Sequence, residues 1–567
     1  MIRKRFTILS LFLSVWAISA TYGQDKLLEI LKDELSQEMK ELSKEEYPPY
    51  HMNFRVIDKQ SYYLNASFGA LVGNSSIHQR KLVPQVRIGD PEFDNFKNRD
   101  MGAGGGPGGL PAASLPLDDR NSGDAIRQSI WNITNSRYNF AVSAYQSDKA
   151  QNAVNVEVED KAPCFSEVPV VKYYEAPMEP SRLTVDTAKW AERLRRISAV
   201  FNRSSDIMSG NAVFMYTVER RYFVNNEGTE VVQNLPYARL MVTAMTKAED
   251  GMELPLNLSY FAYNPDSLPD NDVIIAETEK MVDRLLALRE APMVDPFTGP
   301  AMLSGPAAGV FFHEIFGHRI EGQRMKSEGD GQTFKKMVGQ FVLPPDMQVF
   351  DDPTLDKYIG QDLNGFYKYD DQGVKAERVD VVVDGKLNEF LMTRTPIDGH
   401  PRSNGHARGE AGFDPVSRQS NLVIETKNPK TEAELRQLLI DEAKKQGKDH
   451  GYYFTEVTSG FTFTGRGGTN AFNVTPLEVY KVYIDGRPDE LVRGVDLIGT
   501  PLSMFSNIIY AGDNPAVFTG MCGAESGQIP VTAIAPTILV NKVEMQRKNK
   551  SQNLLPILKR PELKNAD

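Results

Sequence analysis

The stretch Phe311–Gly322 reads FFHEIFGHRIEG and carries two histidines five positions apart, with a glutamate directly after the first. In the common H-E-x-x-H metal motif the histidines are four positions apart and share one face of a helix. Five residues advance a helix by about 500°, which leaves the two side chains about 140° apart. A regular helix therefore cannot present His313 and His318 to one ion. Because a π-bulge absorbs an extra residue and Gly317 has no Cβ, the spacing predicts a distorted helix at residues 315–317.

A metal site here needs a third protein ligand, because a catalytic zinc site has three such ligands and keeps one position for water. Glu321 follows His318 by three residues, and Cys522 lies far downstream in TGMCGAESGQIPV. Glu321 could equally hold the imidazole of a ligand histidine. The glycines beside Cys522 suit a tight turn that presents its sulfur. An isolated histidine is more often an ordinary core or surface residue, so the string alone leaves the site open.

Composition limits the class of protein. The chain has 567 residues, 41% of them hydrophobic and 25% charged, which is ordinary for a globular protein of more than one domain. Its net charge is −11. Because affinity for nucleic acid rests on clustered lysine and arginine, we expect no nucleic-acid partner.

The first residues predict export. Arg3, Lys4 and Arg5 precede an apolar run, Phe6–Ile18, and small residues follow. This pattern is typical of a signal peptide, here residues 1–23, although an uncleaved anchor is the alternative. No second long apolar run exists in the sequence, so we expect a periplasmic or extracellular protein with no integral membrane segment after cleavage. In an exported protein the simplest expectation for two cysteines, Cys164 and Cys522, is one disulfide.

The expected fold class is α+β. We expect an amino-terminal α/β domain at residues 24–110, a central α/β domain at 111–294, a large β-rich domain at 295–548 and a tail at 549–567. The elements that support this division are helices at 25–46 and 119–150, helices starting near Asp186 and at Asn271, Asp-Gly hairpins at residues 384–385 and 485–486, and a helix with a Thr431–Glu434 capping box.

Several further segments occur in a recognisable order over about residues 295–545. They are FDDPTL (350–355), YDDQGVKAERV (369–379), GKLNEFLMTR (385–394) and AGDNPAVFTGMCGAESGQIPV (511–531). Together with HEIFGHRIEG they resemble the TldD/PmbA metalloproteases. The resemblance implies a zinc-dependent peptidase in which His313, His318 and Cys522 bind the ion and Glu314 is the general base. It also implies that Cys164 and Cys522 do not form a disulfide.

The resemblance carries further implications. Family members act on short or unfolded peptides in a cavity closed by dimerisation, either as homodimers or with a TldE-type partner that lacks the metal motif. This chain has the motif and resembles the catalytic TldD-type subunit. It departs from the family in its export signal, in the bulky Ile315 and Phe316, and in Ala524 and Glu525 after the Cys-Gly pair.

Other assignments stay open. His406, Arg402 and Arg408 in PRSNGHARG are candidates for stabilising the oxyanion or binding substrate, against the simpler reading of exposed loop charges. A dipeptidyl-peptidase III type enzyme would take its third ligand from an E-E-x-x-A segment, which we do not find. A scaffold subunit of a TldD/TldE-like complex and an exported binding protein with a Cys164–Cys522 disulfide are the non-enzymatic alternatives.

Overall fold

The computed structural model describes residues 25–97, 112–152, 160–326, 329–462, 464–465, 472–548 and 558. The predicted signal peptide lies outside the described residues, as does the predicted tail apart from Leu558. Helices and extensive sheets occur together, and the carboxy-terminal part is rich in strands, so the α+β fold class is confirmed. No helix among the described residues combines the length and the apolar character that crossing a membrane requires.

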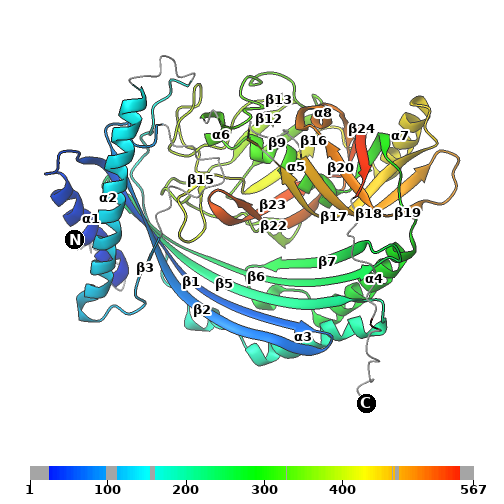
Figure 1. The fold of residues 1–567 in the computed structure, drawn as a ribbon, viewed down its shortest axis with the longest axis horizontal. Helices are drawn as coiled ribbons and strands as arrows, with labels where there is room; N and C mark the ends of the chain where they lie inside the picture. The colour runs from blue at the N-terminus through cyan, green and yellow to red at the C-terminus, as the bar shows by residue number, and fades with distance from the viewer. Residues whose placement is uncertain are drawn as a thin grey trace, which may run out of the picture.

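The amino-terminal half is built on one long, arched sheet of seven strands (Figure 1). Its order is β3-β2-β1-β5-β6-β4, and β7 also pairs with β6. The strands are β1 (Pro49–Ser67), β2 (Ala70–Ile88), β3 (Ala113–Ser114), β4 (Lys172–Tyr174), β5 (Ser209–Asn225), β6 (Glu230–Lys247) and β7 (Glu253–Ala262). Because β1 pairs along its length with both β2 and β5, the expected domains 24–110 and 111–294 share this sheet.

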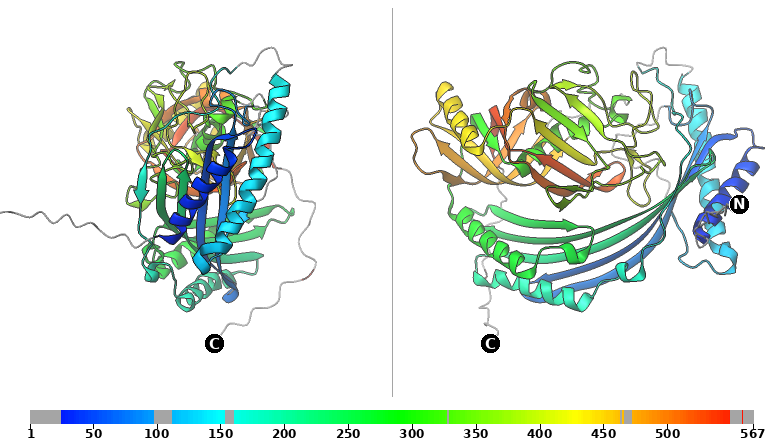
Figure 2. Two further views of the ribbon diagram at one scale, coloured as in Figure 1. Left: turned by 90° about the vertical axis from the view of Figure 1, so that its left-hand side faces the viewer. Right: turned by 180° about the vertical axis from the view of Figure 1, so that it is seen from behind.

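Four helices cover the arched sheet. At one end α1 (Lys26–Leu42) and α2 (Asp124–Asn152) lie side by side, as both views of Figure 2 show. On the convex face lie α3 (Thr187–Ala199) and α4 (Asn271–Glu290) (Figure 1). Asp25 and Asp186 cap α1 and α3 by accepting hydrogen bonds from the backbone N–H groups of Leu28 and Lys189, which satisfies donors that a helix start leaves unpaired. All four helices occupy positions that the sequence predicts.

The carboxy-terminal half contains two sheets with a helix between them. The first has the order β17-β8-β24-β20-β18-β19, with β21 on β24, and β17 also pairs with β18. Its strands are β8 (Phe297–Leu303), β17 (His450–Thr462), β18 (Phe472–Tyr483), β19 (Glu490–Val492), β20 (Val495–Gly499), β21 (Ile508–Ala511) and β24 (Ile538–Arg547).

The second sheet has the order β13-β12-β9-β16-β23-β22. Its strands are β9 (Met347–Asp351), β12 (Val379–Val383), β13 (Lys386–Leu387), β16 (Asn421–Thr426), β22 (Ala516–Ala524) and β23 (Gly527–Ala535). Two short pairs, β10–β11 (Lys357–Tyr358 and Gln361–Asp362) and β14–β15 (Ala407–Arg408 and Val416–Ser417), accompany it. The predicted hairpin at Asp384-Gly385 joins β12 to β13, and the capping box starts α7 (Glu432–Lys445).

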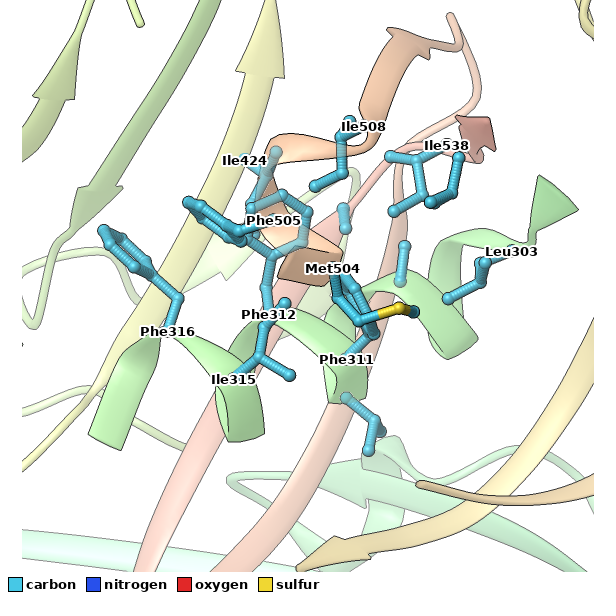
Figure 3. Close-up of a cluster of buried hydrophobic side chains, with 14 of the residues drawn as sticks. Leu303, Phe311, Phe312, Ile315, Phe316, Ile424, Met504, Phe505, Ile508 and Ile538 are labelled. Atoms are coloured by element: carbon cyan, nitrogen blue, oxygen red, sulfur yellow. The ribbon is translucent and has the colours of Figure 1, made fainter. Parts of the chain in front are cut away.

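Helix α5 (Gly305–Ile315) packs between these two sheets and contacts β17 of the first and β22 and β23 of the second. Figure 3 shows its apolar side chains among those of neighbouring elements, including Phe312 close to Phe505 of α8 (Pro501–Ser506). Every residue of α5 after Pro306 is buried. A helix that is apolar on all sides is stable only when surrounded, so this packing fixes α5 and the residues that follow it.

Candidate metal centre

The helix that carries His313 ends before it reaches His318. Ser304 caps α5 and Pro306 occupies its first turn, and the last helical residue is Ile315. Phe316 has φ −120° and ψ −52°, and a short 3-10 turn, η6 (Gly317–Arg319), follows. The predicted distortion at residues 315–317 is therefore present, but it is a break into a 3-10 turn. The expectation of a π-bulge was wrong, because the extra residue is absorbed by ending the helix.

Gly317 packs closely against a neighbouring side chain at this break. A Cβ at Gly317 would lie 1.9 Å from Oε1 of Gln419, which is buried against the turn. The chain at residue 317 therefore runs close to the segment before β16, and the turn redirects His318 towards His313.

The two histidines and Cys522 converge on one point. Sγ of Cys522 lies 3.2 Å from Nε2 of His313 and 3.3 Å from Nε2 of His318. All three ligand atoms lie within 4.8 Å of one another, and all three residues are buried. Zinc bonds to nitrogen of about 2.0–2.1 Å and to sulfur of about 2.3 Å at tetrahedral angles place such atoms about 3.5 Å apart. The donor set and its spacing therefore fit a zinc ion.

Cys522 does not lie on a tight turn, as the sequence suggested. It lies within β22, opposite Ile529 of β23, and the turn follows Ala524. The strand presents the sulfur because alternate residues of β22 face α5. The glycines beside Cys522 are therefore strand residues, and the expected turn was placed a few residues too early.

Glu321 lies behind His318, on the side away from Cys522. Its Oε2 is 3.2 Å from Nδ1 of His318 and accepts a hydrogen bond of 2.8 Å from Nε of Arg324. Arg418 lies 3.4 Å from its other oxygen. Glu321 thus has the position of a group that fixes the tautomer and orientation of a ligand imidazole.

The electrostatics of the cluster favour a cation. Burial would raise the pKa of the Cys522 thiol, but His318, His313 and Arg418 hold that pKa well below its usual range. The thiolate and Glu321 in turn raise the pKa of His318 well above its ordinary value, against the effect of burial. Negative charge on Cys522 and Glu321 that stabilises an imidazolium would equally stabilise a metal cation between the imidazoles.

Glu314 is buried beside the cluster, one residue after His313. Its side chain runs along β17 at Gly460, where an added Cβ would lie 2.1 Å from its Cγ. Among the described residues, no hydrogen bond to its carboxylate is found, whereas its backbone carbonyl accepts one from Arg319. A carboxylate without such a partner remains available to accept a proton.

The three further candidates from PRSNGHARG do not contact these ligands. His406 is fully buried, with Nε2 3.1 Å from Asp351 and Nδ1 3.0 Å from the carbonyl of Asn404. Arg402 is exposed and pairs with Glu377. Arg408 is buried and donates to the carbonyl of Gln419. Arg402 is therefore an exposed loop charge, whereas His406 and Arg408 are buried.

A buried network that the sequence did not reveal supports the site. Arg418 donates to the carbonyl of Cys522 at 2.8 Å, and Arg324 pairs with Glu525 at 3.0 Å as well as with Glu321. Glu525, a departure from the family pattern, thus has a structural partner. The spacing of Arg324 three residues after Glu321 was the one available signal for this network.

Both cysteines are free in the structure. Cys164 is buried elsewhere, with Sγ 3.5 Å from the carbonyl oxygen of Glu92. The alternative of a Cys164–Cys522 disulfide is therefore contradicted, because the sulfur of Cys522 faces two imidazoles.

Comparison with known proteins agrees with this geometry. Residues 297–547 match the family model of the PmbA/TldA metallopeptidase C-terminal domain. This region belongs to the TldD/PmbA family. The matched residues contain His313, Glu314, His318 and Cys522, so the resemblance seen in the sequence is confirmed for the part of the chain that carries the site.

The similar curated proteins are named metalloproteases. One from Archaeoglobus fulgidus is 29% identical over 238 residues, which are 42% of this chain and 51% of that protein. A zinc metalloprotease TldD homologue of Saccharolobus solfataricus is 24% identical over 250 residues, 43% of this chain and 51% of that protein. The aligned part thus spans about half of each relative. Metallopeptidase activity is supported at the level of the family.

Solved structures share the fold along most of the chain. TldE from Thermococcus kodakarensis superposes with a TM-score of 0.59 and 13% identity, covering 92% of this chain and 100% of that one. A Thermotoga maritima protein described as a modulator of a DNA gyrase gives a TM-score of 0.58 and 14% identity, covering 91% and 100%. At these identities the likeness shows a common fold.

Proposed function

We propose that this chain is a zinc-dependent peptidase that hydrolyses peptide bonds in short or unfolded peptides. The observation that carries the proposal is the convergence of His313, His318 and Cys522 beside the buried Glu314, whose carboxylate has no hydrogen-bond partner among the described residues. A purely structural zinc site is closed by four protein ligands and needs no base. Three ligands and an adjacent carboxylate are the composition of a catalytic site.

In this proposal each residue has a defined task. His313, His318 and Cys522 would hold the ion, which when bound lowers the pKa of water and polarises a carbonyl group. Glu314 accepts the proton from the attacking water and then passes it to the leaving amine. Glu321 keeps Nδ1 of His318 engaged, so that Nε2 points towards the ion. Gly460 leaves room for the Glu314 side chain.

The edge of the second sheet offers a place for an extended peptide. In the part of the chain that the structure describes, β22 pairs with β23 alone, so its other edge is open beside Cys522. Met521 and Gly523, which flank the cysteine, are exposed. An extended peptide can add to such an edge through main-chain hydrogen bonds, which are tolerant of sequence. We propose this edge as the substrate-binding edge.

Partner and location extend the same proposal. The presence of all three ligands supports a TldD-type catalytic subunit, acting as a homodimer or with a TldE-like subunit. The basic and apolar pattern of residues 1–23 supports export to the periplasm or the outside of the cell. A non-catalytic scaffold subunit is the competing function, and the experiment below separates the two.

Glu314→Gln tests the proposal directly. Because the variant keeps the ligands and removes the base, we expect bound zinc to be unchanged and cleavage of an unstructured fluorogenic peptide to fall by at least about 100-fold. Zinc content and cleavage rate are measured on the same preparation. Glu442→Gln is the control, because this half-buried glutamate belongs to the same domain and its carboxylate contacts Lys445 and Gln446 at the end of α7. Unchanged cleavage in Glu314→Gln would overturn the role of Glu314 as the base, and no cleavage by the zinc-loaded wild type would favour the scaffold.

A further inference from the structure

A cavity lies between the arched sheet and the carboxy-terminal half, where β22 and β23 pass over β6 and β7 (Figure 1). Its volume is about 320 Å³. The residues that matter for its chemistry are Pro236 of β6, Phe261 and Tyr263 at the end of β7, and Phe366, Arg408 and Pro530 of the carboxy-terminal half.

This cavity is separate from the metal centre. Pro530 lies opposite Met521 in the β22–β23 pair, and Cys522 lies opposite Ile529 at the next position. Successive residues of a strand point to opposite faces of the sheet. Cys522 therefore lies on the face of the hairpin that meets the metal centre, and Pro530 lies on the opposite face, against the cavity.

The cavity opens at a gap in the edge of the arched sheet. On this edge of β6, β4 ends its pairing at Val232 and β7 begins at Ala238. Within the gap, the N–H of Asn234 donates to Glu175 at 2.8 Å, and Pro236 has no N–H to offer. Addition of a peptide strand is therefore disfavoured here, and recognition rests on side chains.

Arg408 brings a buried guanidinium that has no directly paired carboxylate to this cavity. Its side chain is buried, its Nε has no hydrogen-bond partner among the described residues, and none of their carboxylates lies within ion-pair distance. Arg239 is a second buried guanidinium, 5.7 Å from the ring of Phe261, and its own Nη2 lacks a partner among the same residues. Buried cations without a directly paired carboxylate are costly, so an anion at this place would stabilise the fold.

The carboxylates around the cavity are already engaged or exposed. Glu219 pairs with Arg221 at 2.7 Å, and Glu175 pairs with Lys368 at 2.5 Å. Asp356 lies at the exposed rim, where water screens its charge. None of them replaces a counter-ion for Arg408.

We propose that this cavity binds a small carboxylate that carries an aromatic or large apolar group. The carboxylate faces Arg408, and the apolar group lies against Phe261, Tyr263 and Phe366, whose faces provide the apolar walls. Such ligands include the carboxy-terminal residue of a short peptide and a free aromatic acid. Only the first of these sources rests on the proposed peptidase function.

Calorimetric titration with N-acetyl-phenylalanine and N-acetyl-phenylalaninamide tests the charge requirement. We expect the acid to bind one site per chain and the amide to bind at least tenfold more weakly. The titration is repeated on Cys522→Ser, because a carboxylate could also bind a zinc ion at the metal centre. Binding of the acid should be retained in that variant. Loss of binding in Cys522→Ser, equal binding of acid and amide, or no saturable binding would overturn the proposal.

Two variants locate the ligand. Arg408→Met should weaken binding of the acid at least tenfold, and circular dichroism checks its fold. If Arg408→Met does not fold, Phe366→Ala tests the same site. Its matched control is Phe341→Ala, which changes an exposed phenylalanine elsewhere in the same half. Phe366→Ala should weaken binding and Phe341→Ala should not; equal effects would overturn the proposal.

Gly-Gly-Phe and phenylacetate distinguish the sources of the ligand. Tighter binding of the peptide assigns the site to peptide ends, and tighter binding of phenylacetate assigns it to free acids. Either order is consistent with the shared chemistry. Cleavage activity with no ligand binding would overturn this inference and leave the peptidase proposal standing.

Discussion

At the residue scale, the contact between Glu321 and Nδ1 of His318 assigns the glutamate its place. The sequence left Glu321 and Cys522 as alternative third ligands, because sequence separation does not say which side chain reaches which ring nitrogen. The fold settles the placement: the sulfur lies beside Nε2, and the carboxylate lies beside Nδ1. That the three converging residues bind zinc remains a prediction.

Glu321→Gln should weaken zinc binding by about 10–100-fold, because a neutral amide makes the His318 imidazole a less basic ligand. Competition with a chromogenic chelator measures the affinity. The matched control is Glu389→Gln, which removes a carboxylate from Nδ1 of His400, a histidine outside the ligand set. Equal zinc affinity in Glu321→Gln and in the wild type would show that the contact does not tune the metal.

At the element scale, the break between α5 and η6 solves the five-residue spacing. The sequence predicts where the regular helix must fail, because the angle between the histidines is fixed by helix geometry. The sequence could not predict how the helix ends. The choice between a π-bulge and a 3-10 turn depends on Gln419, which packs against Gly317 from about 100 residues away. Local signals did better: the Asp384-Gly385 hairpin has positive φ at both residues, as a tight two-residue turn requires.

Gly460→Ala tests the packing of β17 against α5. The added methyl group would overlap the Glu314 side chain, so we expect cleavage to fall at least about tenfold while zinc remains bound. Peptide cleavage and zinc content report the two effects. Gly73→Ala is the control, because a Cβ at that strand position meets no atom within 4 Å. Normal cleavage by Gly460→Ala would show that the close packing of Gly460 on Glu314 is not needed for cleavage.

At the scale of the whole molecule, one sheet joins residues that the sequence assigns to two domains. The strands themselves could be predicted from their alternation, but the pairing of β1 with β5 joins segments about 150 residues apart, with no local signal for it. The buried network of Arg324, Arg418 and Glu525 was hidden for the same reason. Arg394 then ties the arched sheet to the carboxy-terminal half by pairing with Glu227, which follows β5.

This ion pair predicts a pH dependence of stability. Burial would raise the pKa of Glu227, but Arg394, assisted by His51, lowers it to about 2 from the ordinary 4.5. A lowered carboxyl pKa stabilises the fold above the unfolded-state value, and that stabilisation is lost as the pH falls from about 4.5 towards 2. The difference in Tm between the wild type and Glu227→Gln should therefore be larger at about pH 6 than at about pH 3.

The thermal scans need one control, Glu249→Gln, which changes an exposed glutamate. Its difference in Tm from the wild type should stay small at both pH values. A Tm difference for Glu227→Gln that does not change with pH would mean that the pair with Arg394 does not stabilise the folded chain.

The measurement that tests the central claim most directly is the metal content of the purified protein by mass spectrometry, for the wild type, Cys522→Ser and Cys164→Ser. The account predicts about one zinc ion per chain in the wild type and in Cys164→Ser, and little or none in Cys522→Ser. Absence of zinc from the wild type after growth with zinc, or equal zinc in Cys522→Ser, would contradict the proposal that His313, His318 and Cys522 form a metal centre.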